Sequence, residues 1–568
     1  MSVVLGLNEF FHDTAAALVV DGRLVALIEQ ERLDRRKHAE GFALLGPPPW
    51  EAIRWCLTRA GLSFRDVDRI AVSFDADAPR ALGILAGIVR GNLERASVRN
   101  TLRNRFQLED PALRFFGGLT LGMARRRAFL EDLSRRCDAP VEVVNHHLAH
   151  AASAFFPSGF DDAAIVVLDG QGDACPTSLW EGRGDRLVLR DLEPDPENSL
   201  GILYRAISLA LGFTFMDAGK TMGLAAWGRA REPYLSMLRP EGDRYTIDWP
   251  LVKRITRHHA RYSGELQDVH RDMAASVQQR LEEVGVRLAR RARVLARSPR
   301  ICLAGGVALN CNMNARILTD EGTEGIWVQP GAMDMGCALG AALVAAQRAG
   351  DRLERGFDVY SGTAWSAASI EAALCQRGLA FHRVEDPADA AAERLARREI
   401  VGWFQGRTEF GPRALGSRSI LANPDRAETR DRTNRVKQRE LWRPLAPAIL
   451  EEKASEWFED AARSPYMTLT FRFRPDRIPL VPAVVHADGS ARVQTVNRTD
   501  HPEFRRCIER FEARTGIPMV MNTSFNRRGE PIVHTPEEAL ASFEAREEMD
   551  CLVAGPFVVE RTPGSKTP

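Results

Sequence analysis

The chain contains almost no lysine, although it is rich in basic residues. Only six of its 77 basic residues are lysine, so arginine supplies nearly all of the positive charge. The 76 acidic residues leave a formal net charge of +1, and this balance excludes a protein-wide field that would attract nucleic acid or an anionic membrane. Any polyanion must therefore be bound by a local cluster of basic residues, and a lysine inside a motif is worth noting.

Long apolar runs and paired cysteines are also missing. No stretch reaches the roughly 18 apolar residues that cross a membrane, and no positive region precedes the short apolar run at the N-terminus. The nine cysteines are scattered, odd in number and free of any Cys-x-x-Cys pair, which argues against a disulfide framework and a structural zinc knuckle. We therefore expect a cytoplasmic protein that binds neither a membrane nor nucleic acid.

Size and composition indicate an ordinary globular protein with more than one domain. A chain of 568 residues is too long for one hydrophobic core, and its 45% hydrophobic and 27% charged residues are typical of soluble proteins. The charged, glycine-containing stretch 348–360 has no sustained hydrophobic period and marks a boundary. We expect one domain over residues 1–352 and a second over residues 353–568.

The first domain contains the same pattern twice. A strand, a polar loop, a second strand, a tight turn and a third strand occur near the N-terminus and return later in the chain. The expected strands are 3–7, 15–20 and 24–28 in the first copy and 164–168, 177–180 and 187–189 in the second. Such a repeat predicts an internally duplicated α/β domain. The loops after the first strands carry Asp13 and Asp169, whose carboxylates could hold the metal of a bound phosphate.

An Arg-rich stretch, about residues 88–138, separates the two copies. Acidic residues and apolar periodicity run through it. We therefore favour a solvated helical insertion over an arm that binds nucleic acid.

Three histidines stand within five residues, after a strand-like run and before a small-residue helix pattern. If this segment is helical, His146 and His150 lie one turn apart on the same face, where two imidazoles can converge on a metal ion. The alternative is a set of ordinary polar residues at a helix start that Asn145 caps. The spacing, together with the third ring of His147, favours the metal site.

Two glycine-containing loops of the second copy add candidate ligand-binding residues. Gly305 and Gly306 follow a strand and precede Asn310 and a helix, a pattern that lets backbone amides approach a nucleotide phosphate. Asp334 stands in another such loop, ahead of a helix of small residues. It can cap that helix or serve as a third metal ligand.

The second domain holds basic motifs interleaved with glycine and hydroxyl residues. The segment 406–420 carries three arginines among three glycines, and guanidinium groups bind phosphate oxygens in a bidentate manner. The residues for which we favour polyanion binding are Arg413, Arg418, Lys437, Arg439 and Arg492, beside the amide and hydroxyl donors of Asn522, Thr523 and Ser524. An Arg-rich surface from a biased genome is the alternative, and it suffices for Arg435 or Arg527 alone.

In combination these motifs closely resemble a known family. The chain is similar to the O-carbamoyltransferases of the NodU, CmcH and TobZ type from about residue 3 to about residue 560. The motifs that carry the resemblance are His12-Asp13, His146-His147-Leu148-Ala149-His150, Gly305-Gly306-Val307-Ala308-Leu309-Asn310, Gly411-Pro412-Arg413-Ala414-Leu415-Gly416-Ser417-Arg418 and Asn522-Thr523-Ser524-Phe525-Asn526.

The resemblance implies an α/β protein with two parts. The N-terminal domain would have the duplicated actin and sugar-kinase fold (TsaD-like), and the C-terminal domain would be YrdC-like. In this family the C-terminal domain converts carbamoyl phosphate and ATP, with Mg²⁺, to carbamoyl adenylate. The N-terminal domain then transfers the carbamoyl group to a hydroxyl of a small molecule such as an antibiotic or a sugar. The identity of the acceptor and the existence of a homo-oligomer stay open.

The resemblance also implies roles for individual residues. The family's metal, iron(II) or another divalent cation, is expected at His146, His150 and Asp334. Met333 and Met335, where many relatives have smaller residues, leave the shape of that loop open. Expected contacts to carbamoyl phosphate and ATP are Arg413, Arg418, Lys437, Arg492 and Ser524, of which Arg413, Lys437 and Ser524 are the expected catalytic residues. Further expected cofactor contacts are Asp169, Gly305, Gly306, Asn310, Arg439, Asn522 and Thr523.

His12 is the candidate base for the acceptor hydroxyl, because its loop would face the same crevice. A phosphate contact and a structural hydrogen bond stay open for this ring.

Three other functions compete with this one. An ATP-dependent small-molecule kinase of the same superfamily leaves the basic second domain unexplained. A non-catalytic, actin-like assembly protein gives no role to the histidine pair. A tRNA threonylcarbamoyl transferase is disfavoured because both activities are fused here and no basic RNA-binding tail is evident.

Overall fold

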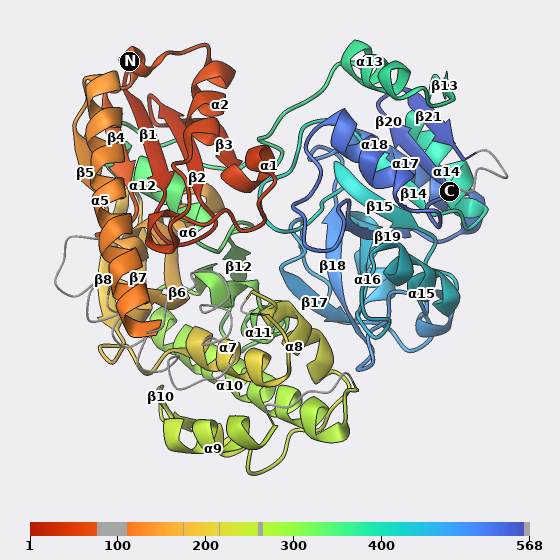
Figure 1. Cartoon of the computed structure of the whole chain (residues 1–568). Coiled ribbons are helices and arrows are strands. Elements are labelled where there is room, and N and C mark those ends of the chain that lie inside the picture. The colour runs from red at the N-terminus through yellow and green to blue at the C-terminus, as the bar shows by residue number, and fades with distance from the viewer. Residues whose placement is uncertain (76–110, 174, 215, 260–264, 562–568) are drawn as a thin grey trace.

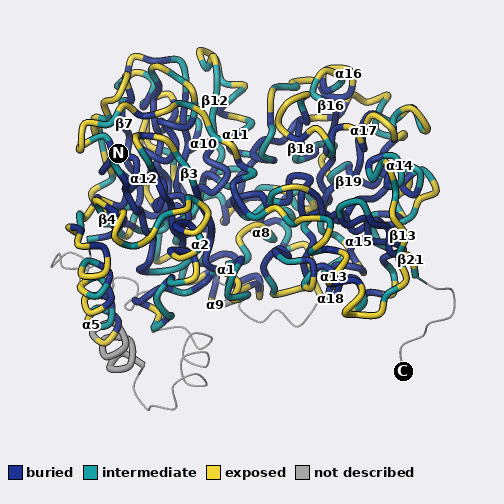
Figure 2. The backbone as a smooth tube through the Cα atoms, turned by 90° about the horizontal axis from the view of Figure 1, so that it is seen from above, coloured by how far each residue is buried: buried dark blue, intermediate teal, exposed yellow. Residues whose placement is uncertain are grey.

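A computed structural model describes the whole chain except residues 76–110, 174, 215, 260–264 and 562–568. Two bodies lie side by side in Figure 1, an N-terminal body coloured red to green and a C-terminal body coloured teal to blue. Figure 2 shows that the buried backbone, in dark blue, lies inside both. In the described ranges, no helix combines the length and the apolar character that a membrane span requires.

The first sheet of the N-terminal body has five strands in the order β3-β2-β1-β4-β5. Its strands are β1 (Val3–Asn8), β2 (Ala15–Val20), β3 (Arg23–Glu29), β4 (Arg69–Val72) and β5 (Val141–Val143). β1 pairs antiparallel with β2 and parallel with β4, and β2 pairs antiparallel with β3. Three consecutive antiparallel strands are therefore extended by two parallel strands that return through helices.

The second sheet repeats this topology in the order β12-β11-β6-β7-β8. Its strands are β6 (Asp162–Gly172), β7 (Cys175–Arg183), β8 (Arg186–Leu192), β11 (Arg300–Ala304) and β12 (Gly325–Val328). β6 pairs antiparallel with β7 and parallel with β11, as β1 does with β2 and β4. The expected duplication and the actin and sugar-kinase fold class are thus confirmed.

Two helices of small residues, α6 (His146–Phe155) and α12 (Met335–Arg348), pack against each other between the two sheets. A Cβ on Gly340 of α12 would lie 1.8 Å from the Ala149 carbonyl oxygen, and one on Gly6 of β1 would lie 2.1 Å from the Ala338 oxygen. Such close backbone approach explains the alanines of α6 and the alanines and glycines of α12. It also brings the first turns of α6 and α12 together.

The remaining helices cover the outer faces of these sheets. α2 (Trp50–Ala60) and α5 (Pro111–Cys137) share a hydrophobic core with the first sheet. The part of the predicted insertion from 88 to 110 lies outside the described residues, and α5 forms the rest. The other elements of the body are α1 (Gln30–Asp34), α7 (Leu200–Ala210), α8 (Ala218–Ala225), β9 (Leu238–Glu241), β10 (Arg244–Ile247), α9 (Trp249–His259), α10 (Asp268–Ala296) and α11 (Cys311–Leu318).

The C-terminal body is built on one mixed sheet of nine strands in the order β13-β21-β20-β14-β15-β19-β16-β18-β17, with a hydrophobic core on each face. Its strands are β13 (Phe381–Arg383), β14 (Val401–Phe404), β15 (Arg418–Ala422), β16 (Ala446–Leu450), β17 (Leu469–Arg472), β18 (Ser490–Val496), β19 (Met519–Ser524), β20 (Cys551–Ala554) and β21 (Phe557–Glu560). Its helices are α13 (Ala367–Arg377), α14 (Pro387–Ala396), α15 (Ala427–Val436), α16 (Ala454–Trp457), α17 (Pro502–Thr515) and α18 (Pro536–Glu544).

Candidate active site

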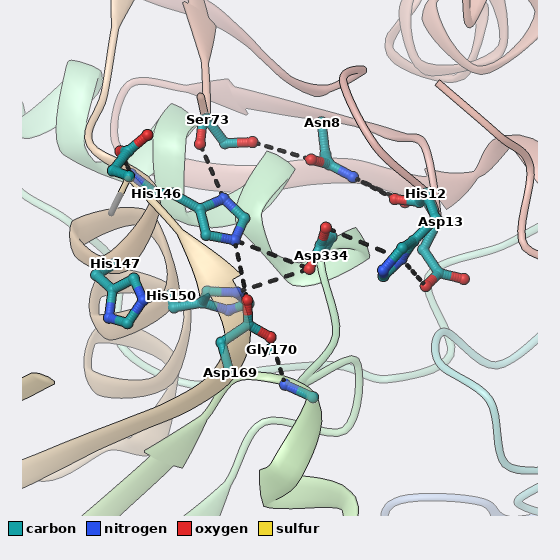
Figure 3. A network of polar contacts seen from close by, with 12 residues as sticks. Asn8, His12, Asp13, Ser73, His146, His147, His150, Asp169, Gly170 and Asp334 are labelled. Atoms are coloured by element: carbon teal, nitrogen blue, oxygen red, sulfur yellow. Dashed lines mark hydrogen bonds and ion pairs between the residues drawn. The ribbon is translucent and has the colours of Figure 1, made fainter. Parts of the chain in front are cut away.

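Two histidines and two aspartates meet where α6, α12 and β6 converge. We refer to His146, His150, Asp169 and Asp334 as the histidine–aspartate cluster. Their ligand atoms lie within 4.8 Å of one another, and all four residues are buried. His146 Nε2 is 3.6 Å from Asp169 Oδ2 and 3.8 Å from Asp334 Oδ1, while His150 Nε2 is 3.9 Å from Asp334 Oδ1. Figure 3 shows these side chains pointing toward one another.

The imidazole nitrogens of this cluster have the properties of metal ligands. His146 Nδ1 lies 3.1 Å from the Ser73 carbonyl oxygen, which only accepts, so the proton of a neutral ring sits on Nδ1 and Nε2 keeps its lone pair. His146 Nε2 and His150 Nε2 are buried and have no hydrogen-bond partner among the described residues. Nitrogen atoms left unpaired beside two carboxylates fit a divalent cation.

The charges of the cluster act strongly on one another. Burial alone would disfavour a charged ring, but the Cys337 sulfur and the Asp169 carboxylate raise the pKa of His146 well above its ordinary value. Burial and the neighbouring His146 lower the pKa of His150 well below its ordinary value. Without a cation, one positive charge is therefore held on one ring between two carboxylates. A divalent cation can take the place of that proton.

The third histidine of the motif is not part of the cluster. His147 Nδ1 lies 2.7 Å from Ser178 Oγ, and Figure 3 shows the ring turned away from His146. Burial lowers the pKa of His147 to about 4. Cys337, which no motif indicated, also has its sulfur within 4.8 Å of ring nitrogens of His146 and His150, and burial raises the pKa of this thiol to about 12.

His12 lies next to the cluster, in the loop after β1. Its Nδ1 is 2.8 Å from Asp13 Oδ2 and 3.9 Å from Asp334 Oδ2. Asp13 in turn accepts from His38 Nδ1 at 2.9 Å. Burial opposes the charged ring, but Asp334 and Asp13 prevail and raise the pKa of His12 to about 9. A ring that holds its proton suits a phosphate contact, while a role as base requires a bound cation to reduce the pull of Asp334.

One cavity of about 900 Å³ connects this region to the C-terminal body. Of the expected site residues, His12, Asp169, Gly306, Asn310, Asp334, Arg413 and Ser524 line it. Metal-site and phosphate-site candidates that are far apart in the sequence thus face a common space.

Arg413 and Arg443 line the C-terminal end of this cavity, and three further basic residues lie close enough to act on their charges. We refer to Arg413, Lys437, Arg439, Arg443 and Arg492 as the cationic cluster. Burial, Arg492 and Arg443 lower the pKa of Arg413 to about 9, and burial with Arg443 and Arg492 lowers the pKa of Arg439 well below its ordinary value. Arg443 lies 3.9 Å from Glu440, whereas the other four form no ion pair with a carboxylate of the described residues. Buried or half-buried cations without counter-ions indicate a binding site for an anion.

Lys437 is the most closely surrounded member of the cationic cluster. It follows α15, is 6% exposed, and donates to the backbone and side-chain oxygens of Ser524 and Asn526. Burial and the neighbouring Arg439 lower the pKa of Lys437 well below its ordinary value. Its partners Ser524 and Asn526 line the cavity, so the ammonium group sits directly behind the cavity wall.

Arg418, the other arginine of the 406–420 segment that was expected to contact phosphate, does not line the cavity. Arg418 is fully buried, and its guanidinium stacks 3.9 Å above the Phe404 ring. It donates to the carbonyl oxygens of Gln405, Ser417, Thr363 and Gly406. The structure therefore places Arg418 behind the loop, where it closes the loop, and not among the cavity residues.

Four other expected contacts also lie in supporting positions. Asn522 donates to the Ala414 oxygen and to Gln494 Oε1, at 3.2 and 2.9 Å, and Thr523 stands opposite Ile420 in the β15–β19 pair. Gly305 has a φ of +88°, and a Cβ there would lie 2.2 Å from the Leu168 oxygen. Arg492 is half-buried, and its Nε atom is buried without a hydrogen-bond partner among the described residues.

Asp169 and Asn310 have hydrogen-bond partners within the N-terminal body. Asp169 Oδ1 accepts from Gly306 N at 3.1 Å, so this carboxylate meets both the glycine turn and the histidine pair. Asn310 caps α11 and exchanges side-chain hydrogen bonds with Gln278.

Sequence reasoning missed Arg205 as a site residue. It lies on α7, where it is the one charged residue of an otherwise uncharged helix, and it lines the cavity. Burial lowers the pKa of Arg205 to about 10, although Asp169 and Asp334 oppose this shift. The sequence did contain a signal, a single arginine among apolar helix residues. Hydrophobic periodicity alone would assign such an arginine to the protein surface.

Comparison with known proteins agrees with this geometry. Residues 3–343 match the family model described as carbamoyltransferase N-terminus, and residues 392–561 match the one described as carbamoyltransferase C-terminus. Nodulation protein NolNO of Sinorhizobium fredii is 36% identical, with 98% of this chain and 80% of that protein covered. Nodulation protein NolO of Bradyrhizobium diazoefficiens is 40% identical, with 74% and 80% covered.

More distant proteins are also similar. Nodulation protein U of Sinorhizobium fredii is 29% identical, with 91% of this chain and 92% of that protein covered. The solved structure of HypF from T. kodakarensis is 13% identical over 62% of this chain and 48% of its own, with a TM-score of 0.35, a likeness too weak for a functional argument. The family models alone account for most of the chain. The chain therefore belongs to the carbamoyltransferase family and is a carbamoyltransferase.

Proposed function

We propose that the protein is an O-carbamoyltransferase that activates carbamoyl phosphate with ATP as carbamoyl adenylate and transfers the carbamoyl group to a hydroxyl of a small molecule. One observation carries this proposal. A single cavity has a candidate anion site at one end and a candidate cation site at the other. A carbamoyl group activated at one end can reach the other without leaving the protein.

The cationic cluster supports the activation step. A carbamoyl group is a poor electrophile because its nitrogen donates into the carbonyl, and a mixed anhydride with AMP supplies a better leaving group. Water first cleaves carbamoyl phosphate to carbamate and phosphate. A carbamate oxygen then bonds to the α-phosphorus of ATP and pyrophosphate leaves, so negative charge develops on phosphate oxygens in both steps. Arg413 faces these oxygens from the cavity wall, and Lys437 lies behind Ser524, where a bound anion would favour its charged form.

The histidine–aspartate cluster supports the transfer step. When bound there, a divalent cation such as iron(II) supplies a Lewis acid that polarises a carbonyl or holds a phosphate. His146, His150, Asp169 and Asp334 would hold it. Arg205 stabilises negative charge on the departing AMP, and His12 contacts either that phosphate or the acceptor hydroxyl. The acceptor oxygen forms the new bond to the carbamoyl carbon, AMP leaves, and the hydroxyl proton passes to a base or to solvent.

Product analysis tests this proposal. The protein is incubated with carbamoyl phosphate, ATP, Mg²⁺, iron(II) and a panel of hydroxylated metabolites, and products are weighed by mass spectrometry. A carbamoyl mass gain that requires both carbamoyl phosphate and ATP is expected, and a Lys437→Met protein should not produce it. A phosphoryl mass gain that needs ATP alone would establish the kinase instead.

A further inference from the structure

A buried ion pair of the N-terminal body holds a loop of the C-terminal body. Glu29 ends β3 and Arg32 lies in α1, their side chains are 3% and 1% exposed, and Arg32 Nη2 is 3.3 Å from Glu29 Oε1. Glu29 Oε1 accepts from the Gly411 amide at 2.7 Å, and Arg32 Nη2 donates to the Gly411 carbonyl at 2.6 Å. Both polar groups of one glycine are therefore bound by one pair from the other body.

Gly411 is held in a conformation that only glycine adopts readily. Its φ is +99°, and a Cβ there would lie 2.8 Å from the Pro330 oxygen. The preceding Phe410 ring packs onto Gly331, where an added Cβ would lie 2.2 Å from the ring. Pro330 and Gly331 belong to the loop that leads to Asp334. The pair thus fixes the 406–418 loop where it crosses the chain segment that leads to a candidate metal ligand.

The other end of the loop is fixed from within the C-terminal body. Asn522 donates to the Ala414 oxygen and Gln494 Nε2 donates to the Leu415 oxygen, at 3.2 and 2.8 Å. Between these anchors and Gly411 stand only Pro412, whose ring restricts the backbone, and Arg413. Pro412 and Arg413 both line the cavity, and Arg413 is therefore the one charged residue of a short segment anchored on both sides.

Stability alone is a poor explanation of the Glu29–Arg32 pair. Arg32 Nε and Nη1 are buried, and no residue in the described part of the chain forms a hydrogen bond with them. A buried ion pair with unpaired donors is commonly no more stabilising than apolar side chains of the same volume. Its specific result is the placement of Gly411, which apolar side chains could not reproduce.

We infer that Glu29 and Arg32 are positioning residues for Arg413. They complete the anion site of the C-terminal body from the N-terminal body by fixing the loop two residues ahead of Arg413. This inference rests on the proposed function, in which Arg413 contacts a phosphate. It assigns no chemistry to Glu29 or Arg32 themselves.

The experiment is a double-mutant cycle of Arg32→Met and Arg413→Met in the full chain. Sulfate is the probe, because it resembles phosphate and does not titrate near neutral pH, and its dissociation constant is measured by calorimetry. Arg32→Met is expected to weaken sulfate binding about tenfold in the wild-type background and not at all in the Arg413→Met background. Arg32→Lys, which can still donate to the Gly411 oxygen, should restore part of the affinity.

Arg355→Met is the matched control. Arg355 also donates to two backbone carbonyls, those of Phe160 and Gly184, but these lie away from the 406–418 loop. This variant should lower the melting temperature and leave sulfate affinity unchanged.

If Arg32→Met has the same profile as the control, or if its effect on sulfate affinity adds fully to that of Arg413→Met, the pair does not position Arg413. If Arg413→Met alone leaves sulfate binding intact, the proposed function fails at its anion site and the positioning inference fails with it. Should Arg32→Met not fold, Arg32→Lys and Arg32→Gln decide by the same cycle.

Discussion

The two ends of the cavity balance their charges in opposite ways. At the end in the N-terminal body, two imidazoles face two carboxylates, and the unpaired ring nitrogens and carboxylate oxygens lie within 4.8 Å. At the C-terminal end, four cations lie together without a carboxylate in ion-pair distance among the described residues. One end therefore suits a cation and the other suits an anion, and this difference points to two steps in one cavity.

The largest expected effect comes from removing a carboxylate at the N-terminal end. Asp334→Asn keeps the shape of the side chain, removes one charge and should reduce bound metal from about one ion per chain to near zero. Carbamoyl transfer should fall by more than about 100-fold, above the usual cost of losing a partner of a metal ligand. Elemental analysis of the purified protein measures the metal content, and a product assay measures the rate of carbamoyl transfer. Full metal content in this variant would show that Asp334 is not a metal ligand.

The next largest effect comes from the C-terminal end. Arg413→Met should raise the KM for carbamoyl phosphate by about 30-fold, the cost of removing one member of a desolvated charge pair, and should leave metal content unchanged. Arg407→Met, in the same loop, is the control because Arg407 donates to the Ser361 and Gly362 oxygens and does not line the cavity. Equal effects of the two substitutions on KM would show that Arg413 has no specific contact to carbamoyl phosphate.

These two substitutions also show how far the sequence could lead. The duplicated sheets, the α6 histidine pair and Asp334 followed from periodicity, helical spacing and a recognisable family pattern. The different fates of Arg413 and Arg418 could not follow, because both stand in the same Gly-Arg motif and only the fold decides which one points into the cavity. Asp169 was expected to contact the cofactor, and its approach to His146 depends on packing between β6 and α6.

Arg205 and the Glu29–Arg32 pair were out of reach for a related reason. Arg205 stands alone on α7, and Glu29 contacts Gly411 across some 380 positions of the sequence. Such contacts join elements that are distant in the sequence and meet only in the folded protein. No local pattern records them.

A smaller effect should appear as a pH dependence of anion binding. Burial and neighbouring cations lower the pKa of Lys437 in the free protein. A bound anion favours the ammonium form, so binding takes up a proton and the affinity for sulfate should fall as the pH rises. The decrease cannot exceed about tenfold per pH unit for one group. Calorimetry at several pH values measures it, and Lys437→Met should abolish the slope. A slope that survives in this variant would assign the proton to another group.

The smallest effect is expected for the third histidine of the motif. His147 bonds Ser178 and faces away from the cluster, so His147→Gln should keep metal content within about twofold of wild type. Metal analysis beside a His150→Gln protein, which should lose the ion, provides the contrast. Loss of metal in both variants would mean that metal binding depends on His147 as well as on His146 and His150.

The division of labour between the two ends can be measured by exchange of labelled pyrophosphate into ATP in the presence of carbamoyl phosphate, because this exchange reports activation without transfer. Two variants are compared, His146→Ala at the N-terminal end and Lys437→Ala at the C-terminal end. Exchange should continue near the wild-type rate in His146→Ala and should disappear in Lys437→Ala. Loss of exchange in a folded His146→Ala protein would contradict the assignment of activation and transfer to opposite ends of the cavity.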